Sequence, residues 1–221
     1  MDRGAHLEAG LSPPATAGAR WVARYLLPAV RARLASRAPL DCAQIDPDDG
    51  EEIERMREHG HACDALRFAP LGMGGALDRR LPGASLDLAW TGRYGRVAPA
   101  DRPAFARELA RALRPGGAFL NGIGNRLCPV DLSGNAPLLH GPGCATLATL
   151  AELEATFSPA AGFRRVTLLG AAGHFGWHRL RGPARIARFP LEGWWRLLEA
   201  TDLRWLRAGP LNPRLMAWIE R

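Results

Sequence analysis

The chain has 221 residues, of which 47% are hydrophobic, so it is long enough to bury one full core with a small appendage. No run approaches the roughly 20 apolar residues that a membrane-spanning helix needs, and no basic stretch followed by an apolar one opens the sequence. These features argue against a membrane span and a secretory signal, and we expect a cytoplasmic protein.

The net charge of +7 comes from arginine alone, because the chain contains no lysine. Residues 1–163 hold 18 arginines and 18 acidic residues, whereas residues 164–221 hold 11 arginines and 4 acidic residues. The basic C-terminal part is either a surface that attracts an anionic partner or a solvated face. No recognition motif accompanies the charge, so we do not expect nucleic acid as the partner.

The four cysteines, Cys42, Cys63, Cys128 and Cys144, form no CxxC pair and have no ordered histidine spacing. Structural zinc sites draw their ligands from such closely spaced pairs. We therefore expect four free thiols and no metal site.

The N-terminal part predicts a loose lead-in followed by a helix. Residues 1–18 are small and polar and contain two adjacent prolines, which is typical of a poorly packed terminus. Over residues 19–35, apolar side chains recur at helical spacing, which predicts an amphipathic helix interrupted or kinked at Pro28. Residues 19–221 are expected to form a single domain.

Residues 40–66 predict a strand, a helix and a second strand. The first strand falls within residues 40–46, and an acid-rich helix start predicts a helix over residues 51–59. Residues 61–66 then form the second strand, and the glycine-rich run at residues 71–75 is a connection, because it lacks the spacing and the lysine of a phosphate-binding loop.

Residues 85–120 organise the rest of the chain. A short apolar run at residues 85–90 predicts a strand, and helical spacing over residues 103–114 predicts a helix. Pro115, Gly116 and Gly117 end that helix, and the apolar run resumes at residues 118–120 as another strand. Strand, helix, tight turn and strand form a right-handed βαβ unit of a parallel sheet.

The C-terminal half predicts a loop, a helix and two further strands. The loop extends from residue 121 to residue 143, and residues 146–157 predict a helix with a Thr149–Glu152 capping box. Strands are expected over residues 162–169 and 214–221. Between them, residues 170–210 form an insertion rich in tryptophan and arginine.

Within this insertion, residues 189–206 predict one helix with four large apolar side chains on one face: Trp194, Leu197, Leu198 and Trp205. Such a face is suited to core packing, to a homodimer or protein partner, to a lid, or to membrane attachment. Core packing or dimerisation is favoured over the membrane because the same helix carries three acidic residues: Glu192, Glu199 and Asp202.

The motifs LDLAW at residues 86–90 and ELARALRPGG at residues 108–117, with the strand after them, resemble the class I S-adenosylmethionine-dependent methyltransferases. The likeness covers about residues 21–170 and the last strand. It implies an α/β, Rossmann-like, doubly wound and mostly parallel sheet with flanking helices, shortened between its second and fourth strands. It also implies methyl transfer from S-adenosylmethionine to an unidentified small-molecule or glycan-type acceptor.

The resemblance implies cofactor contacts in residues 40–67, where two registers remain open. In the first, residues 40–45 are strand one, the glycine-rich cofactor loop keeps only Gly50, and the ribose-binding acid is Asp64 or has been replaced by Arg67. In the second, strand one is absent, Asp46 is the ribose acid and Asp64 lies near the adenine. We favour the first, because losing a central strand costs more burial than losing a peripheral one.

The cofactor-binding candidates are therefore Asp46, Gly50, Asp64, Arg67 and Trp90. The acceptor side is expected in the loop after residue 120, since the carboxyl ends of strands line the ligand crevice in open α/β sheets. Its candidates for substrate binding are Asn125, Arg126 and Asp131. Catalytic candidates are Asn125 and His140, because an oxygen acceptor needs a general base; His174 and His178 also lie downstream.

Three departures from the family pattern support an alternative function. The glycine loop is eroded, Arg67 stands where an acid is expected, and residues 91–96 lack the acid–histidine pair that many members carry. Together they argue against tight cofactor binding and leave, as the alternative, a non-catalytic methyltransferase-like protein that serves as a binding or partner subunit.

Overall fold

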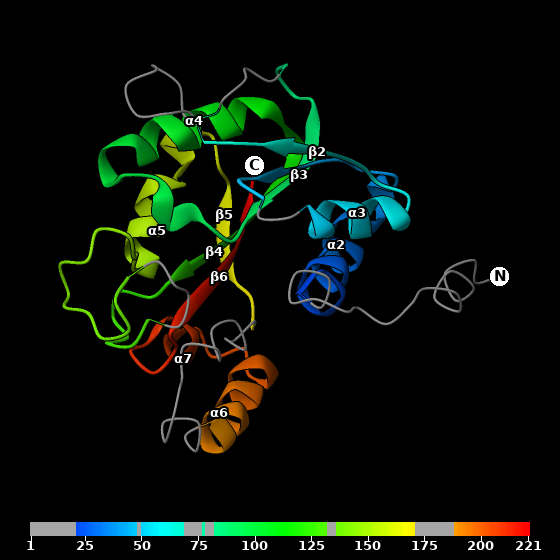
Figure 1. Cartoon of the computed structure of the whole chain (residues 1–221). Helices are drawn as coiled ribbons and strands as arrows, with labels where there is room; N and C mark the ends of the chain where they lie inside the picture. The colour runs from blue at the N-terminus through cyan, green and yellow to red at the C-terminus, as the bar shows by residue number, and fades with distance from the viewer. Residues whose placement is uncertain (1–20, 48–49, 69–76, 78–81, 132–135, 171–187) are drawn as a thin grey trace.

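The computed structural model describes residues 21–47, 50–68, 77, 82–131, 136–170 and 188–221. In this part of the chain, six strands form one sheet in the order β2-β1-β3-β4-β6-β5 (Figure 1). The strands are β1 (Asp41–Ile45), β2 (Ala62–Leu66), β3 (Leu86–Thr91), β4 (Leu113–Gly124), β5 (Arg165–Leu168) and β6 (Arg214–Glu220). Within the same residues, no helix is long and apolar enough to cross a membrane.

The four strands β2, β1, β3 and β4 are parallel to one another, and antiparallel pairing occurs only around β6 among the described strands. β1 pairs in parallel with β2 and β3, and β3 pairs in parallel with β4. β6 runs antiparallel between β4 and β5. All six residues of β3 are buried, as expected for a strand that is covered on both faces.

The helices, in chain order, are η1 (Val22–Leu26), α2 (Leu27–Leu34), α3 (Glu51–Glu58), α4 (Arg102–Ala112), α5 (Leu150–Thr156), α6 (Arg188–Ala200) and α7 (Arg204–Ala208), and both faces of the sheet are covered. Figure 1 shows α2 and α3 on one side and α4 and α5 on the other. One core cluster joins α2 and α3 to the sheet through Val30, Ile53 and Trp90. The other joins α4 and α5 to it through Phe105 and Leu153. This arrangement is the predicted doubly wound α/β fold.

The β3–α4–β4 unit has the predicted form. Strands β3 and β4 are parallel neighbours, but α4 already ends at Ala112 and β4 begins at Leu113, so the Pro-Gly-Gly segment lies within β4 and not in a turn before it. The pairing shifts register between Leu86 and Leu88 beside this segment. Gly116 has φ +74°, a conformation that glycine adopts at no steric cost. At Gly117 a Cβ atom would lie 2.9 Å from the carbonyl oxygen of Arg114 and 3.0 Å from that of Asp87. The glycine pair therefore allows the chain to lie close against β3.

The position of β1 favours the first of the two registers. β1 lies between β2 and β3 in the interior of the sheet, and four of its five residues are buried. A central, buried strand is what the first register requires of residues 40–45. The predicted capping box is also present, with Thr149 as N-cap, although helix α5 begins at Leu150 and not at residue 146.

The N-terminal helix changes type beside Pro28. The π-helical turn η1 gives way to α2 at Leu27, and the short 3-10 helix η2 (Ala35–Arg37) follows. Proline has no N–H with which to continue the hydrogen-bond ladder, so the helix is irregular there, as the sequence predicts. Residues 1–20 lie outside the part of the chain that the structure describes.

The single helix predicted over residues 189–206 is wrong. The hydroxyl oxygen of Thr201 accepts a hydrogen bond from the backbone N–H of Leu203, and this local bond ends α6 before α7 begins. Leu198 is buried, but Leu197 is 52% exposed and Trp205, now on α7, is 70% exposed. The predicted common apolar face is therefore divided. Residues 171–187 of the predicted insertion, with His174 and His178, fall outside the described residues.

Candidate functional site

The carboxyl ends of the parallel strands meet at one edge of the sheet. β1 ends at Ile45, β3 at Thr91 and β4 at Gly124, and the antiparallel strand β6 begins at the same edge with Arg214. The connections diverge here, because β1 leads outward to β2 while β3 leads the other way to β4. In open α/β sheets such a switch point is where ligands bind, so this edge is the candidate site.

Asp46 is held in place directly after β1. Its φ of +56° lies in the left-handed region, which aspartate tolerates better than most residues. Its backbone N–H donates to the carbonyl oxygen of Leu66 at 2.7 Å. Its Oδ2 forms ion pairs with Nη1 of Arg96 at 2.7 Å and Nη1 of Arg93 at 3.7 Å. Asp46 therefore links the end of β1 to the loop after β3.

The start of α3 completes this part of the edge. Gly50 is its N-cap, with φ +80° and open space where a side chain would stand. Oε2 of Glu52, in the first helical turn, accepts hydrogen bonds from Nε2 of Gln44 and Nε1 of Trp90, both at 2.8 Å. Trp90 is fully buried. Its indole therefore packs in the core and donates to Glu52 at the start of α3.

The two candidates from β2 lie farther along the sheet. Asp64 pairs with Ala43 in the middle of β2, and its side chain is exposed. Arg67 is the first residue after β2 and is also exposed. The first register predicts an acid at the end of the second strand. In the structure β2 ends at Leu66 and is followed by Arg67, whereas Asp64 lies two residues before the end of the strand.

The loop after β3 is anchored by a buried tyrosine. Tyr94 opens the 3-10 helix η3 (Tyr94–Arg96), and its ring lies 5.7 Å from that of Phe105 and 5.6 Å from that of Phe157, between centroids. Burial raises the pKa of its hydroxyl. The guanidinium of Arg102 lies over the Tyr94 ring and donates to the carbonyl oxygen of Ala145 at 2.8 Å. Burial lowers the pKa of Arg102. These contacts hold the loop rigidly against the sheet.

Asn125, a predicted acceptor-side and catalytic candidate, is 1% exposed and has a stabilising role in the structure. Its Nδ2 donates to the carbonyl oxygens of Gly209 and Asn212, each at 2.9 Å, and lies 3.2 Å from that of Ala208. Its Oδ1 accepts from the N–H of Leu127 at 3.1 Å. The amide therefore fastens the segment before β6 to the end of β4.

The other acceptor-side candidates lie in the loop that follows. Arg126 forms an ion pair with Glu152 at 2.5 Å and donates to the carbonyl oxygen of Leu147 at 2.9 Å. Asp131 is 1% exposed, and its Oδ2 accepts from the N–H of Ala136 at 2.6 Å. His140 donates from Nδ1 to the carbonyl oxygen of Gly141 at 3.2 Å. Each of these side chains stabilises the loop that carries it.

The sequence and the fold were compared with known proteins. No family model matches the sequence, and no curated protein matches it. Among solved structures, a SAM-dependent methyltransferase from Archaeoglobus fulgidus superposes with a TM-score of 0.51 at 12% identity, over 89% of this chain and 93% of that chain. An S-adenosylmethionine-dependent methyltransferase from Mesorhizobium loti superposes at 0.45 and 17% identity, over 92% and 98%.

A possible exported protein from Bordetella parapertussis also superposes, with a TM-score of 0.45 at 13% identity, and the chain spans 65% of that protein's length. Identities this low carry information about architecture alone. The chain has a class I S-adenosylmethionine-dependent methyltransferase-like fold. Residues 67–85 connect β2 to β3, and because most of them lie outside the described residues, the shortening between the family's second and fourth strands stays a prediction.

Arg214, which the sequence analysis did not select, lies at this edge of the sheet as the first residue of β6. It is 7% exposed, and Nη2 donates to the carbonyl oxygen of Gly92 at 3.3 Å. A Cβ at Gly122 would lie 2.7 Å from the same nitrogen, so the guanidinium lies directly against this glycine. Burial lowers the pKa of Arg214 to about 10, and the carboxylates of Asp131 and Glu52 partly offset that shift. In the sequence, Gly92 after β3 and Gly122 within β4 were the signals that a bulky side chain packs here.

Asn121 is a second missed residue at this edge. It is fully buried near the end of β4, opposite Thr91 of β3. Neither its Oδ1 nor its Nδ2 has a hydrogen-bond partner within the described part of the chain. Leaving such a group unpaired costs about 1–3 kcal/mol, so a buried amide here marks a position that packing alone does not explain. A polar residue inside the run AFLNGIG was the signal.

The four cysteines are free thiols, as predicted. Cys42 and Cys63 are opposite each other on β1 and β2, and the hydrogen bond from Cys63 together with burial raises the pKa of the Cys42 thiol. A thiol in that state is a weak nucleophile and a weak metal ligand. Among the described residues, no group of three or more histidine, cysteine, aspartate or glutamate side chains could hold a metal ion.

Proposed function

We propose that the protein is a methyltransferase that binds S-adenosylmethionine at the switch point between β1 and β3. The observation that carries the proposal is the topology of this edge in a methyltransferase-like sheet, with β1 and β3 as neighbours whose connections diverge. The acceptor that we propose is a small molecule or a glycan, as the sequence resemblance implies.

The residues at the switch point fit such a cofactor. Gly50 has no atom within 4 Å of the place that a Cβ would occupy, so its backbone borders open space at the start of α3. The carboxylates of Asp46 and Glu52 lie on either side of this turn and would attract the cofactor's ammonium and sulfonium charges. Asp64 or Arg67 is our candidate for the ribose contact.

S-adenosylmethionine would supply an activated methyl group, and the protein's part would be to align the acceptor and to exclude water. Rigid loops are suited to that task. The loop after β3 is fixed by Tyr94 and Arg102, and the loop after β4 by Asn125. Of the candidates for a general base, His140 is the one within the described residues.

Isothermal titration calorimetry with S-adenosylmethionine and S-adenosylhomocysteine tests the proposal. Micromolar binding is expected, and Asp46→Asn should weaken it by about tenfold, because a charge-assisted contact is lost while asparagine keeps the left-handed backbone. Asp64→Ala and Arg67→Ala then show which residue contacts the ribose. Asp101→Asn, on the opposite side of the sheet from α3, is a charge-matched control that should leave the affinity unchanged.

A second candidate function, a non-catalytic binding or partner subunit, is favoured by a specific observation. Arg96 neutralises the carboxylate of Asp46 across the switch point, and the carboxylate of Glu52 is already engaged by Gln44 and Trp90. If these contacts close the site, the intact protein will not bind S-adenosylmethionine even at millimolar concentration. Arg96→Gln separates the two functions, since restored binding would identify a site that is closed by its own ion pair.

A further inference from the structure

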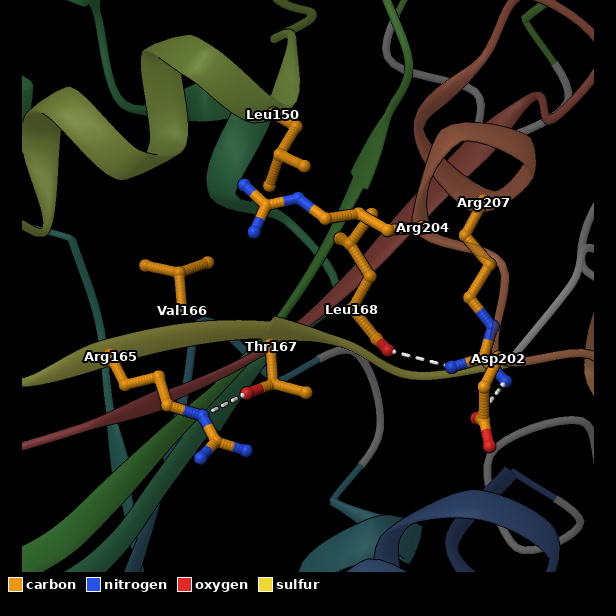
Figure 2. A pocket seen from close by; sticks show the side chains of 8 residues that line it. All are labelled: Leu150, Arg165, Val166, Thr167, Leu168, Asp202, Arg204 and Arg207. Carbon is orange, nitrogen blue, oxygen red and sulfur yellow. Dashed lines mark hydrogen bonds and ion pairs between the residues drawn. The ribbon is translucent and has the colours of Figure 1, made fainter.

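The edge strand β5 lies at the far end of the sheet from β2, and among the strands that the structure describes it pairs with β6 alone. A hollow of about 370 Å³ runs alongside β5, and all four residues of the strand line it. The other lining residues come from α5 and from the α6–α7 region: Leu150, Asp202, Arg204 and Arg207. Figure 2 shows this hollow, which belongs to a different part of the sheet from the switch point.

The hollow includes side chains from both faces of β5. Arg165 and Thr167 lie on one face, and Val166 and Leu168 lie on the other, as expected for alternating residues of a strand (Figure 2). A hollow that touches both sets follows the open edge of the strand. An unpaired strand edge is a template for another extended chain.

Arginines lie at both ends of this edge. At its start, Arg164 and Arg165 are exposed, and neither guanidinium forms an ion pair with any residue that the structure describes. Arg165 instead donates from Nε to the hydroxyl of Thr167 at 2.9 Å, which leaves its Nη groups pointing outward from β5 (Figure 2). Two adjacent strand residues point to opposite faces, so the two cations flank the edge from both sides.

At the other end, Arg207 donates from Nη1 to the carbonyl oxygen of Leu168 at 3.0 Å and pairs through Nη2 with Asp202 at 3.0 Å. Arg204 pairs with Glu154, and both side chains are substantially exposed. Exposed ion pairs contribute only about 0–1 kcal/mol, so Arg204 can exchange this partner at little cost. Four arginines thus lie near three carboxylates, because Glu220 of β6 is directly opposite Arg165, and the edge keeps an excess of positive charge.

We propose that the open edge of β5 binds an extended acidic segment of a partner protein, which adds to the sheet as a further strand. Successive side chains of an added strand point to opposite faces, so two neighbouring acids reach Arg165 on one face and Arg204 on the other. The backbone of the segment pairs with β5. Arg207, by occupying the carbonyl oxygen of Leu168, marks where the pairing ends.

The probe is a short fluorescein-labelled peptide in which pairs of glutamates alternate with single valines or threonines. We expect saturable binding by fluorescence anisotropy at low ionic strength, together with slower hydrogen exchange at the backbone amides of Val166 and Leu168, which alternate along β5 with the amides that pair with β6. A peptide of the same sequence with alternate backbone nitrogens methylated keeps the charge but loses the ladder hydrogen bonds. It should bind on the order of tenfold more weakly.

Protein variants test the charged contacts. Arg165→Gln combined with Arg204→Gln should reduce the affinity for the glutamate peptide on the order of tenfold or more. The matched control is Arg57→Gln, which removes an exposed arginine of α3 that pairs with Glu54 at 2.6 Å. It should leave the affinity unchanged. Circular dichroism verifies that every variant is folded.

Three results would overturn the proposal. The first is absence of binding by the glutamate peptide, and the second is equal binding of the methylated and unmethylated peptides, which would mean attraction without strand pairing. The third is binding of the unmethylated glutamate peptide to the Arg165/Arg204 double variant with the same affinity as to the unmodified protein. A single-stranded thymidine oligonucleotide is tested in parallel. If it binds through these arginines while methylation of the peptide has no effect, the edge is a polyanion surface and not a strand acceptor.

Discussion

The two βαβ units of the sheet are built alike but use their side chains differently. In the β3–α4–β4 unit, every residue of β3 is buried and α4 buries six of its residues. In the β1–α3–β2 unit, α3 buries only Ile53 and Met56, and β2 buries two of its five residues. The first unit is therefore held by apolar burial, and the second combines a smaller core with the polar groups of the switch point.

Because of this difference, the residues that stabilise the fold and the residues that form the candidate site lie largely in different βαβ units. The polar side chains that meet at the switch point include Gln44, Asp46 and Glu52 of the second unit, and their partners Trp90 and Arg96 come from β3 and the loop after it. Such groups contribute less to folding than apolar burial does, because hydrogen bonds to water are exchanged for those within the protein. Changes in the first unit should mainly unfold the protein, and changes in the second should mainly alter the site.

The largest expected effect is that of Phe119→Ala in the first unit. Phe119 is fully buried in β4, with its ring 5.8 Å from that of Phe105 and 5.6 Å from that of Phe157. The lost packing and the cavity should lower the free energy of unfolding by about 3–5 kcal/mol. Urea denaturation followed by circular dichroism measures it. Cys63→Ala in β2 is the counterpart from the second unit, with an expected loss of about 1 kcal/mol; equal losses would contradict the comparison.

A smaller effect is expected at the glycines of the two units. At Gly117 a Cβ meets backbone carbonyls of both β3 and β4, so Gly117→Ala should cost about 1–3 kcal/mol. At Gly50 the space is open and asparagine tolerates the positive φ, so Gly50→Asn should cost less than about 1 kcal/mol. Thermal unfolding compares the two. Gly83→Ala, where a Cβ makes ordinary contact with Arg111, is the control and should change little.

An effect on stability well below that of Phe119→Ala is also expected at Glu52 of the second unit. Glu52→Ala leaves the buried donors of Gln44 and Trp90 without their acceptor, which should cost about 1–2 kcal/mol. Glu52→Gln keeps an acceptor oxygen and should cost less. Denaturant unfolding measures both variants, and calorimetry with S-adenosylmethionine shows whether the site changes with them. A loss as large as that of Phe119→Ala would mean that the polar contacts, and not burial, hold this unit.

The sequence predicted much of the fold and less of the site. The strand–helix–strand pattern around Pro115 and the capping box at Thr149 are confirmed, because both depend on residues close together in the chain. The break between α6 and α7 was missed, since one hydroxyl of Thr201 outweighed an apolar periodicity. Asn125 was correctly placed at the carboxyl edge, but its amide faces a segment more than 80 residues later in the chain, which no local pattern reveals.

The sequence by itself determined the order of the elements, the buried strands and the sheet's doubly wound class. Those follow from periodicity, turn chemistry and apolar runs, which act over a few residues. Only the tertiary structure decided that Arg96 pairs with Asp46, that Arg214 lies across Gly92 and Gly122, and that β5 is left with an open, arginine-flanked edge. These are contacts between distant segments, and the packing of the sheet alone brings such segments together.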